Sequence, residues 1–263
     1  AVLGAPAIAS AQTEIRPYLT ADVSLGFDVG GDNLFSSGDD VDYHNGNLVT
    51  SNFGLRASHD LGNGLTAHGQ LEGDFNTATG DVLDSGAFRR GANVGLEGAF
   101  GRVHLGTKGN PFTSFHGASY AMGGNTVSSN TARAMGYGNF FTQKSVTYST
   151  PKLAGFSAQL QYGFEDATSG ANATPFGYAH ESVVAGYARY EIAGLTVGAA
   201  AMDVKGIDGV TDDKTAWMAA VSYQLGALQL NAAWIDNDDV NVGADDNTAW
   251  QVGLKYAVNP QLA

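Results

Sequence analysis

Nine charged or titratable side chains in the first half of the chain occur at alternate positions of segments that read as strands. The basic ones are Arg16, Arg56, Arg102, His104 and Lys108, and the acidic ones are Asp22, Asp28, Glu72 and Asp74. Because side chains of a strand point alternately to its two faces, all nine are predicted to line one polar surface. Rings of charge around a water-filled passage select ions by charge, which is the chemistry that this pattern predicts. The alternative is that such a surface tolerates any polar residue.

Catalysis and nucleic-acid binding find little support. The six histidines are scattered, and the sequence contains no H-E-x-x-H, G-x-S-x-G or phosphate-binding glycine loop. The chain has no cysteine, which excludes disulfides and thiolate metal sites. A net charge of −13 disfavours nucleic acid. We therefore predict neither an enzyme nor a cofactor.

Two acidic runs are the only candidates for a metal ion. Residues 236–239 and 245–247 combine Asp and Asn, whose oxygens suit calcium. Neither run has the full spacing of a calcium-binding loop, so solvated turns are the alternative to weak Ca²⁺ binding.

Period-two alternation from Glu14 onward predicts an all-β chain. One face of the first segment carries Leu19, Val23 and Phe27, and the other carries Arg16, Thr20 and Ser24. Twelve such strands are predicted, at 16–29, 48–60, 65–75, 87–98, 101–109, 143–150, 154–165, 180–191, 194–204, 215–224, 227–236 and 247–257. Many are ten residues or longer, against a usual length of about five or six.

Short and long connections alternate strictly along the chain. The short ones lie near 61–64, 98–101, 150–154, 191–194, 224–227 and 257–260, and the long ones near 30–46, 76–86, 109–143, 165–179, 204–214 and 236–247. Outer-membrane β-barrels have short periplasmic turns and long external loops, whereas soluble sandwiches follow no such rule. The pattern favours a transmembrane antiparallel up-and-down β-barrel.

Aromatic residues near the strand ends support the same fold. Tyr190, Tyr223 and Tyr256 precede short turns, and the three tryptophans, Trp217, Trp234 and Trp250, lie towards the long-loop ends. Two such bands are typical of aromatic girdles at the two surfaces of a bilayer.

The longest connection, 109–143, contains no acidic residue and is predicted to fold into the lumen and narrow it. Arg133 is its best candidate for a pore-facing charge. Its aromatic residues either pack it against the wall or form an apolar slide for a solute; packing is favoured. Arg89 and Arg90 are adjacent in a predicted strand, so only one of them is expected to face inward.

The acidic residues gather at the rim. The other five long connections and their flanks hold 18 of the 26 acids and two basic residues, so the rest of the chain holds 11 basic and 8 acidic residues. Charge at the rim is screened beyond about 8 Å at physiological salt. We therefore expect weak ion selectivity, with a slightly basic wall.

The first eleven residues are uncharged and mostly apolar, and end in Ala9-Ser-Ala11. They are typical of the end of a secretory signal peptide, and residues 12–263 are assigned to the β-domain. An ordinary apolar N-terminus is the alternative.

Three stretches resemble the Gram-negative general diffusion porins, particularly the alphaproteobacterial type. The first is the hairpin 52–72, in which a basic strand leads through Asp60-Leu-Gly-Asn-Gly-Leu65 to Gln70-Leu-Glu72. The others are the hairpin 94–106 and Ser145-Val-Thr-Tyr-Ser-Thr-Pro-Lys-Leu-Ala-Gly-Phe156. The resemblance implies a trimer of sixteen-stranded barrels whose third external loop folds inward. That loop often presents carboxylates in the family, and here it has none. Family members end in a strand with a terminal Phe, so a C-terminal truncation is expected.

Together these features predict a passive channel in the outer membrane. It would contact lipid and lipopolysaccharide, and would pass small hydrophilic solutes and ions. The alternatives are a solute-specific porin, a non-conducting outer-membrane barrel used for adhesion or anchoring, and a soluble secreted β-protein.

Overall fold

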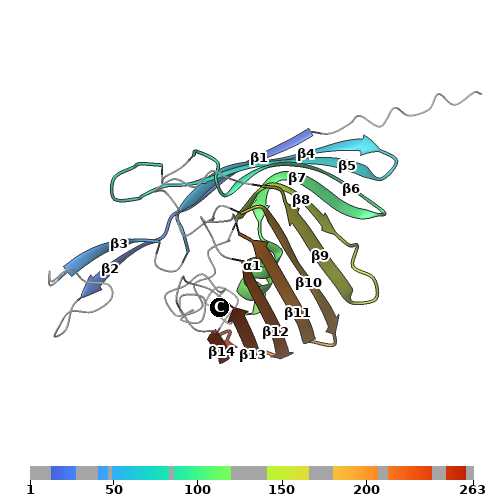
Figure 1. Cartoon of the computed structure of the whole chain (residues 1–263). Helices are drawn as coiled ribbons and strands as arrows, with labels where there is room; N and C mark the ends of the chain where they lie inside the picture. The colour runs from blue at the N-terminus through green and yellow to red at the C-terminus, as the bar shows by residue number, and fades with distance from the viewer. Residues whose placement is uncertain are drawn as a thin grey trace, which may run out of the picture.

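A computed structural model describes residues 13–27, 41–46, 49–82, 86–119, 141–165, 180–206, 213–238 and 247–258. Twelve strands form one antiparallel sheet in the order β1-β4-β5-β6-β7-β8-β9-β10-β11-β12-β13-β14 (Figure 1). From β4 onward each strand pairs with the next along the chain. They are β1 (Thr13–Thr20), β4 (Asn52–Gly62), β5 (Leu65–Asp74), β6 (Gly91–Gly98), β7 (Gly101–Gly109), β8 (Phe141–Ser149), β9 (Phe156–Gly163), β10 (Ser182–Ile192), β11 (Leu195–Lys205), β12 (Lys214–Leu225), β13 (Leu228–Asp238) and β14 (Asn247–Tyr256). The predicted antiparallel up-and-down order is confirmed.

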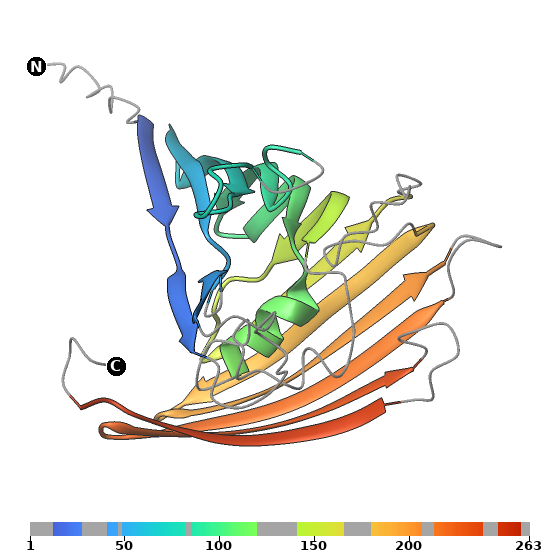
Figure 2. The same cartoon turned by 90° about the vertical axis from the view of Figure 1, so that its left-hand side faces the viewer.

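The sheet is strongly curved, and one helix, α1 (Pro111–Ser119), lies on its concave side (Figure 2). The convex face carries exposed apolar side chains along every strand, such as Leu19, Leu55, Leu105 and Val252. Exposed apolar rows on one face of a sheet require an apolar surrounding, which a bilayer provides. Within the described residues, the helical segment is too short and too polar to cross a membrane.

The aromatic residues near the strand ends lie on this apolar face. Trp217, Trp234 and Trp250 are exposed, as are Tyr190, Tyr223 and Tyr256. Trp234 is paired with Trp250 across β13 and β14, while Leu228 and Tyr256 pair at the other end of the same two strands. The exposed aromatics therefore form two bands at opposite strand ends, as the girdle interpretation predicts.

Short hairpins with tight turns join neighbouring strands at one end of the sheet. In the turn between β10 and β11, Ala193 and Gly194 both have positive φ, of 47° and 83°. Two central residues with positive φ match the right-handed twist of the paired strands, which explains why two residues suffice here.

The first predicted strand, 16–29, was wrong in its length. It ends at Thr20, and Val23–Phe27 forms β2, which pairs with β3 (Val41–Asn45) in a separate two-stranded sheet. The chain leaves the large sheet at Asp22, whose carboxylate accepts a hydrogen bond from the Val49 amide at 2.6 Å. The Asp22 amide in turn donates to the Ser51 hydroxyl at 3.0 Å. These bonds to the start of β4 replace the ladder that a continuous strand would have formed.

The long connection after β7 begins with a helix that the alternation did not predict. Asn110 caps α1: its Oδ1 accepts the Phe112 amide at 2.8 Å, and its carbonyl accepts the Ser114 amide at 2.9 Å. Pro111 occupies the first helical position, where a missing amide hydrogen costs least. An Asn followed by Pro is a helix-start signal, so this element was readable from the sequence.

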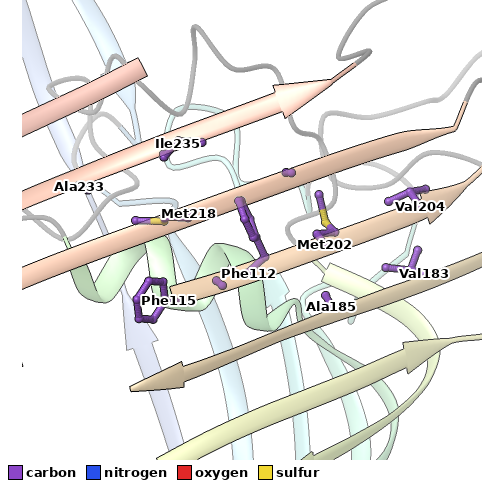
Figure 3. Close-up of a cluster of buried hydrophobic side chains, with 11 residues drawn as sticks. Phe112, Phe115, Val183, Ala185, Met202, Val204, Met218, Ala233 and Ile235 are labelled. Carbon is purple, nitrogen blue, oxygen red and sulfur yellow. The ribbon is translucent and has the colours of Figure 1, made fainter. Parts of the chain in front are cut away.

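Helix α1 covers an apolar area of the inner wall. Phe112 and Phe115 are 0% and 4% exposed, and lie three residues apart on one face of α1 (Figure 3). The strands beneath contribute Val183, Ala185, Ala200, Met202, Val204, Ala216, Met218, Ala233 and Ile235. A Cβ at Gly198 would lie 2.7 Å from the Phe115 ring, so this position leaves room for the aromatic side chain. The inner face of β10 to β13 is therefore apolar under α1, which the strand alternation does not predict.

Candidate functional site

The inner face of β1 and β4 to β9 is polar, in contrast to the area under α1. The strand register places Arg16 opposite Arg56, Arg56 opposite Gln70, and Gln70 opposite Asn93 in one row. Like charges directly opposite one another repel. Here Arg16 bonds Glu14 at 2.6 Å, and Arg56 lies 4.4 Å from the centre of the Tyr18 ring, which spreads the two charges apart.

Glu72 is the centre of the hydrogen-bonded network on this wall. Its Oε1 accepts from Arg90 Nε at 2.8 Å, and its Oε2 accepts from Tyr18 and from Gln70 Nε2, the latter at 2.9 Å. The Arg56 guanidinium stands 4.0 Å away. The side chains of Glu72 and Arg90 are only 11% and 12% exposed. The positive charge of Arg90 therefore balances the negative charge of Glu72 within a buried ion pair. Glu72 adds little free negative charge to the wall.

Asp74 is paired still more tightly. Arg89 donates from Nε to Oδ1 at 2.8 Å and from Nη2 to Oδ2 at 2.7 Å, a bidentate pair. The Asp74 side chain is 0% exposed and that of Arg89 8%. Such a pair is held by geometry as well as by charge. Asp74 therefore fixes the turn before β6 and is closed to solvent.

The prediction that only one of Arg89 and Arg90 faces inward was wrong. Both bind acids of β5, because residues 87–90 form a turn and β6 begins only at Gly91. Strand alternation does not apply within a turn. The guanidinium of Arg90 also lies 4.8 Å from the centre of the Phe141 ring on β8.

A second charged group lies near the short-turn ends of β5 to β7. Glu97 accepts from Arg102 and bonds His68 Nε2 at 2.9 Å. His104 is 6% exposed, and its Nδ1 has no hydrogen-bond partner within the described part of the chain. Lys108 follows on the same strand and makes no ion pair with a described residue. Arg102, His104 and Lys108 lie along β7 and line one depression, and their pore-lining role stays a prediction.

One predicted site residue has another placement, and two lie outside the described residues. Asp22 is 9% exposed and holds the backbone at the start of β4, as described above. Asp28 and Arg133 lie outside the described residues, and for them the pore-lining role stays a prediction. The acidic runs proposed for calcium fall mainly outside as well, and the described residues hold no cluster of three potential metal ligands.

The rim offers one described ion pair between a long connection and a strand. Lys205 donates to Asp213 Oδ2 at 2.8 Å, and the Gly206 amide donates to Oδ1 at 2.9 Å. These bonds, together with the Lys205 charge, lower the pKa of Asp213. The carboxylate is thus kept ionised at the base of its loop.

His116 on α1 gives the helix a pH-dependent attachment. Burial lowers its pKa to about 3, from an ordinary value of 6.5. As the pH falls through 6.5, the unfolded chain gains a proton that the folded state refuses until about pH 3, so stability is lost over this window. Between pH 7 and 4.5 we expect the free energy of unfolding to fall by about 2–3 kcal/mol more than in His116→Gln. Urea unfolding in lipid vesicles at both pH values measures this difference; equal losses in the two proteins would contradict it.

Comparison with known proteins agrees with this architecture. The Gram-negative porin family matches residues 1–262. An outer membrane porin protein of Bordetella pertussis is 31% identical over 169 residues, 59% of this chain and 44% of that protein. Outer membrane porin protein 32 of Delftia acidovorans is 29% identical over 205 residues, 73% of this chain and 54% of that protein. The chain spans about half the length of these relatives.

Solved porins share the fold at low sequence identity. The anion-selective porin from Comamonas acidovorans superposes with a TM-score of 0.72 at 21% identity, over 94% of this chain and 75% of that one. OmpF of Salmonella typhi gives 0.65 at 15% identity, over 94% and 74%. These structures confirm the predicted β-barrel class, and the family match with the outer membrane porin relatives confirms the outer-membrane location. With its alternating wall, its lumen-side helix and the family match over nearly its whole length, the chain belongs to the Gram-negative porin family.

Proposed function

We propose that the protein forms a water-filled channel for the passive diffusion of small hydrophilic solutes and ions across the outer membrane. The observation that carries this is the contrast between the two faces of β1 and β4 to β9. The convex face is lined with exposed apolar residues, and the concave face with Arg56, Gln70, Arg102 and Gln159. Apolar side chains towards lipid and polar ones towards a lumen are what an aqueous pore requires. The proposed function involves no chemical step.

The charge balance of the wall supports a weak preference for anions. Glu72, Asp74 and Glu97 each bind an arginine, so their charges are largely balanced. Arg56 and Lys108 lie beyond these close pairs: Arg56 is 4.0 Å from Glu72, with a side chain that is 64% exposed. Uncompensated positive charge on a pore wall raises the local concentration of anions.

Arg56→Glu is expected to move the reversal potential towards that of a cation-selective channel. The substitution changes the charge of the wall by two units at a side chain that faces the proposed ion path, within a Debye length of passing ions. Reversal potentials in planar bilayers under a KCl gradient provide the measurement. Lys205→Glu makes the same charge change at the rim, where a smaller shift is expected. Equal shifts would show that Arg56 is no closer than the rim to the ion path.

The same measurement applies to Arg133, for which the sequence predicts a place at the constriction. Arg133→Glu is expected to shift the reversal potential in the same direction as Arg56→Glu, and an unchanged potential would remove it from the ion path.

Single-channel recording separates the proposed function from an adhesive or anchoring barrel. Purified protein that inserts into bilayers and never produces conductance steps contradicts the channel. A homotrimer, and contacts with lipid and lipopolysaccharide, are further proposals that rest on the family resemblance; chemical cross-linking in outer membranes tests the trimer.

A further inference from the structure

A polar depression lies on the concave wall beside the short turns that join β6 to β7 and β8 to β9. Its volume is about 290 Å³. We call it the wall pocket and define it by Glu97, Arg102, His104, Lys108, Ser149 and Gln159, with Lys152 at its edge. Hydroxyl, amide, guanidinium, ammonium and imidazole groups therefore face one space.

The wall pocket holds more positive than negative charge. Arg102 is balanced by Glu97, and Lys152 by Glu191 on β10. Lys108 has no such close partner among the described residues; the charges of Arg102 and Arg56 act on it most strongly, and that of Glu72 opposes them. A lysine held among other cations raises the local affinity for an anion.

His104 is the buried member of the wall pocket. The residue is 6% exposed, lines the wall pocket, and has a buried Nδ1 without a hydrogen-bond partner in the described structure. Its ring lies across Gly95 of β6, where a Cβ would approach the ring to 2.6 Å. Buried polar atoms are nearly always paired in proteins, so a polar group that came close to this nitrogen would relieve the cost of its burial.

The available donors suit an oxyanion better than a halide. Arg102 has N–H groups beyond the one used for Glu97, and a guanidinium binds two oxygens of one anion side by side. The Ser149 hydroxyl accepts from Gln159 Nε2 at 2.8 Å, which leaves its own hydrogen free to point into the space. An anion with several oxygens can use these donors together, whereas chloride offers a single atom.

We propose that the wall pocket is a binding site for small solutes that carry a phosphate group. The inference rests on the proposed channel, because such a solute reaches the pocket from the water of the lumen. A solute held on the wall is concentrated there at low external concentration, and its flux then saturates as the pocket fills. The channel would combine unsaturable passage of chloride with saturable passage of phosphate.

Planar-bilayer recording with inorganic phosphate as the probe tests this site. We expect the phosphate current of the wild-type protein to saturate with concentration, while the chloride current rises in proportion. Lys108→Gln is expected to raise the half-saturating phosphate concentration about tenfold, the effect of losing one charge-assisted hydrogen bond. Arg102→Gln, a second variant, is expected to act in the same direction.

Arg16→Gln is the matched control. It removes one positive charge from the same face, on β1 and outside the wall pocket, where the side chain is 73% exposed. We expect its half-saturating phosphate concentration to equal that of the wild type. Chloride conductance of each variant shows that it has folded and inserted.

The outcomes separate the two proposals. No conductance steps in chloride would overturn the channel and the site with it. Steps in chloride together with a phosphate current that rises in proportion to concentration would overturn the site alone. If Lys108→Gln and Arg16→Gln raised the half-saturating phosphate concentration equally, the wall pocket would not be a specific site. The effect would then come from the overall positive charge of the wall.

Discussion

Asp74→Ala is expected to lower the free energy of unfolding by about 3–5 kcal/mol, because it leaves a buried guanidinium without its bidentate counter-charge. Arg89 is 8% exposed and donates to both carboxylate oxygens of Asp74. Water cannot replace the lost carboxylate without opening the turn before β6. Equilibrium unfolding in urea, followed by tryptophan fluorescence in lipid vesicles, measures the change.

Glu14→Ala is the control for this prediction. It also deprives an arginine of a carboxylate, but the Arg16 and Glu14 side chains are 73% and 49% exposed. Exposed pairs contribute less than about 1 kcal/mol, since water takes over the interaction. A double variant, Asp74→Ala with Arg89→Met, is expected to recover part of the loss because the buried positive charge is removed as well. If Asp74→Ala and Glu14→Ala cost the same, Arg89 is not held by the pair in the folded protein.

Strand positions and the apolar face were predictable because both depend on local alternation. Leu55, Val94 and Leu105 each belong to a row of apolar residues at every second position of their own strand, and lipid on one side leaves no other face for these rows. The order of the sheet was also predictable, since short turns force consecutive strands to pair. Twelve strands follow from these two rules without any knowledge of tertiary contacts.

The break after Thr20 was not predictable in the same way. Alternation runs on from Thr20 to Phe27 without interruption, and the bonds that redirect the chain join Asp22 to Val49 and Ser51. Such contacts between residues far apart in sequence leave no local pattern. Helix α1 is different, because Asn110 and Pro111 form a local helix-start signal. The strand alternation does not include this signal, so the helix was not predicted.

The apolar area under α1 was not predictable from the alternation of polar and apolar residues that located the other strands. Met202, Met218 and Ile235 lie on the lumen side, where alternation assigns polar residues. They are buried because α1, in the connection after β7, packs over them. No feature of their own strands predicts this contact. A strand that is apolar on both faces is the sign that something packs on its inner side. The predicted packing of Phe112 and Phe115 against the wall is confirmed by this cluster.

Phe112→Ala is expected to weaken the attachment of α1 by about 3–5 kcal/mol, the usual effect of removing a buried phenylalanine ring. Phe112 is 0% exposed and stands among the lumen-side residues of β10 to β13 (Figure 3). Asn110 still caps the helix, so the loss falls on the contact between helix and wall. Urea unfolding in vesicles measures the stability, and single-channel recording measures the consequence for the lumen.

Phe100→Ala separates the cavity effect from the mere loss of an aromatic ring. Phe100 lies in the turn between β6 and β7 and is 47% exposed, so its removal leaves no cavity. We expect a smaller loss of stability and an unchanged conductance for this variant.

The conductance of Phe112→Ala then decides what α1 does. If the helix narrows the lumen, its looser attachment must increase the single-channel conductance and its fluctuations, because the restriction is no longer held at one position. If stability falls while conductance stays constant, ions pass away from α1, along the wall that carries Arg56 and Lys108. In that case the charges on β4 and β7 control the current, and the helix only stabilises the inner face of β10 to β13. The two results are mutually exclusive, so one variant assigns the constriction either to the bulk of the helix or to the charge of the wall.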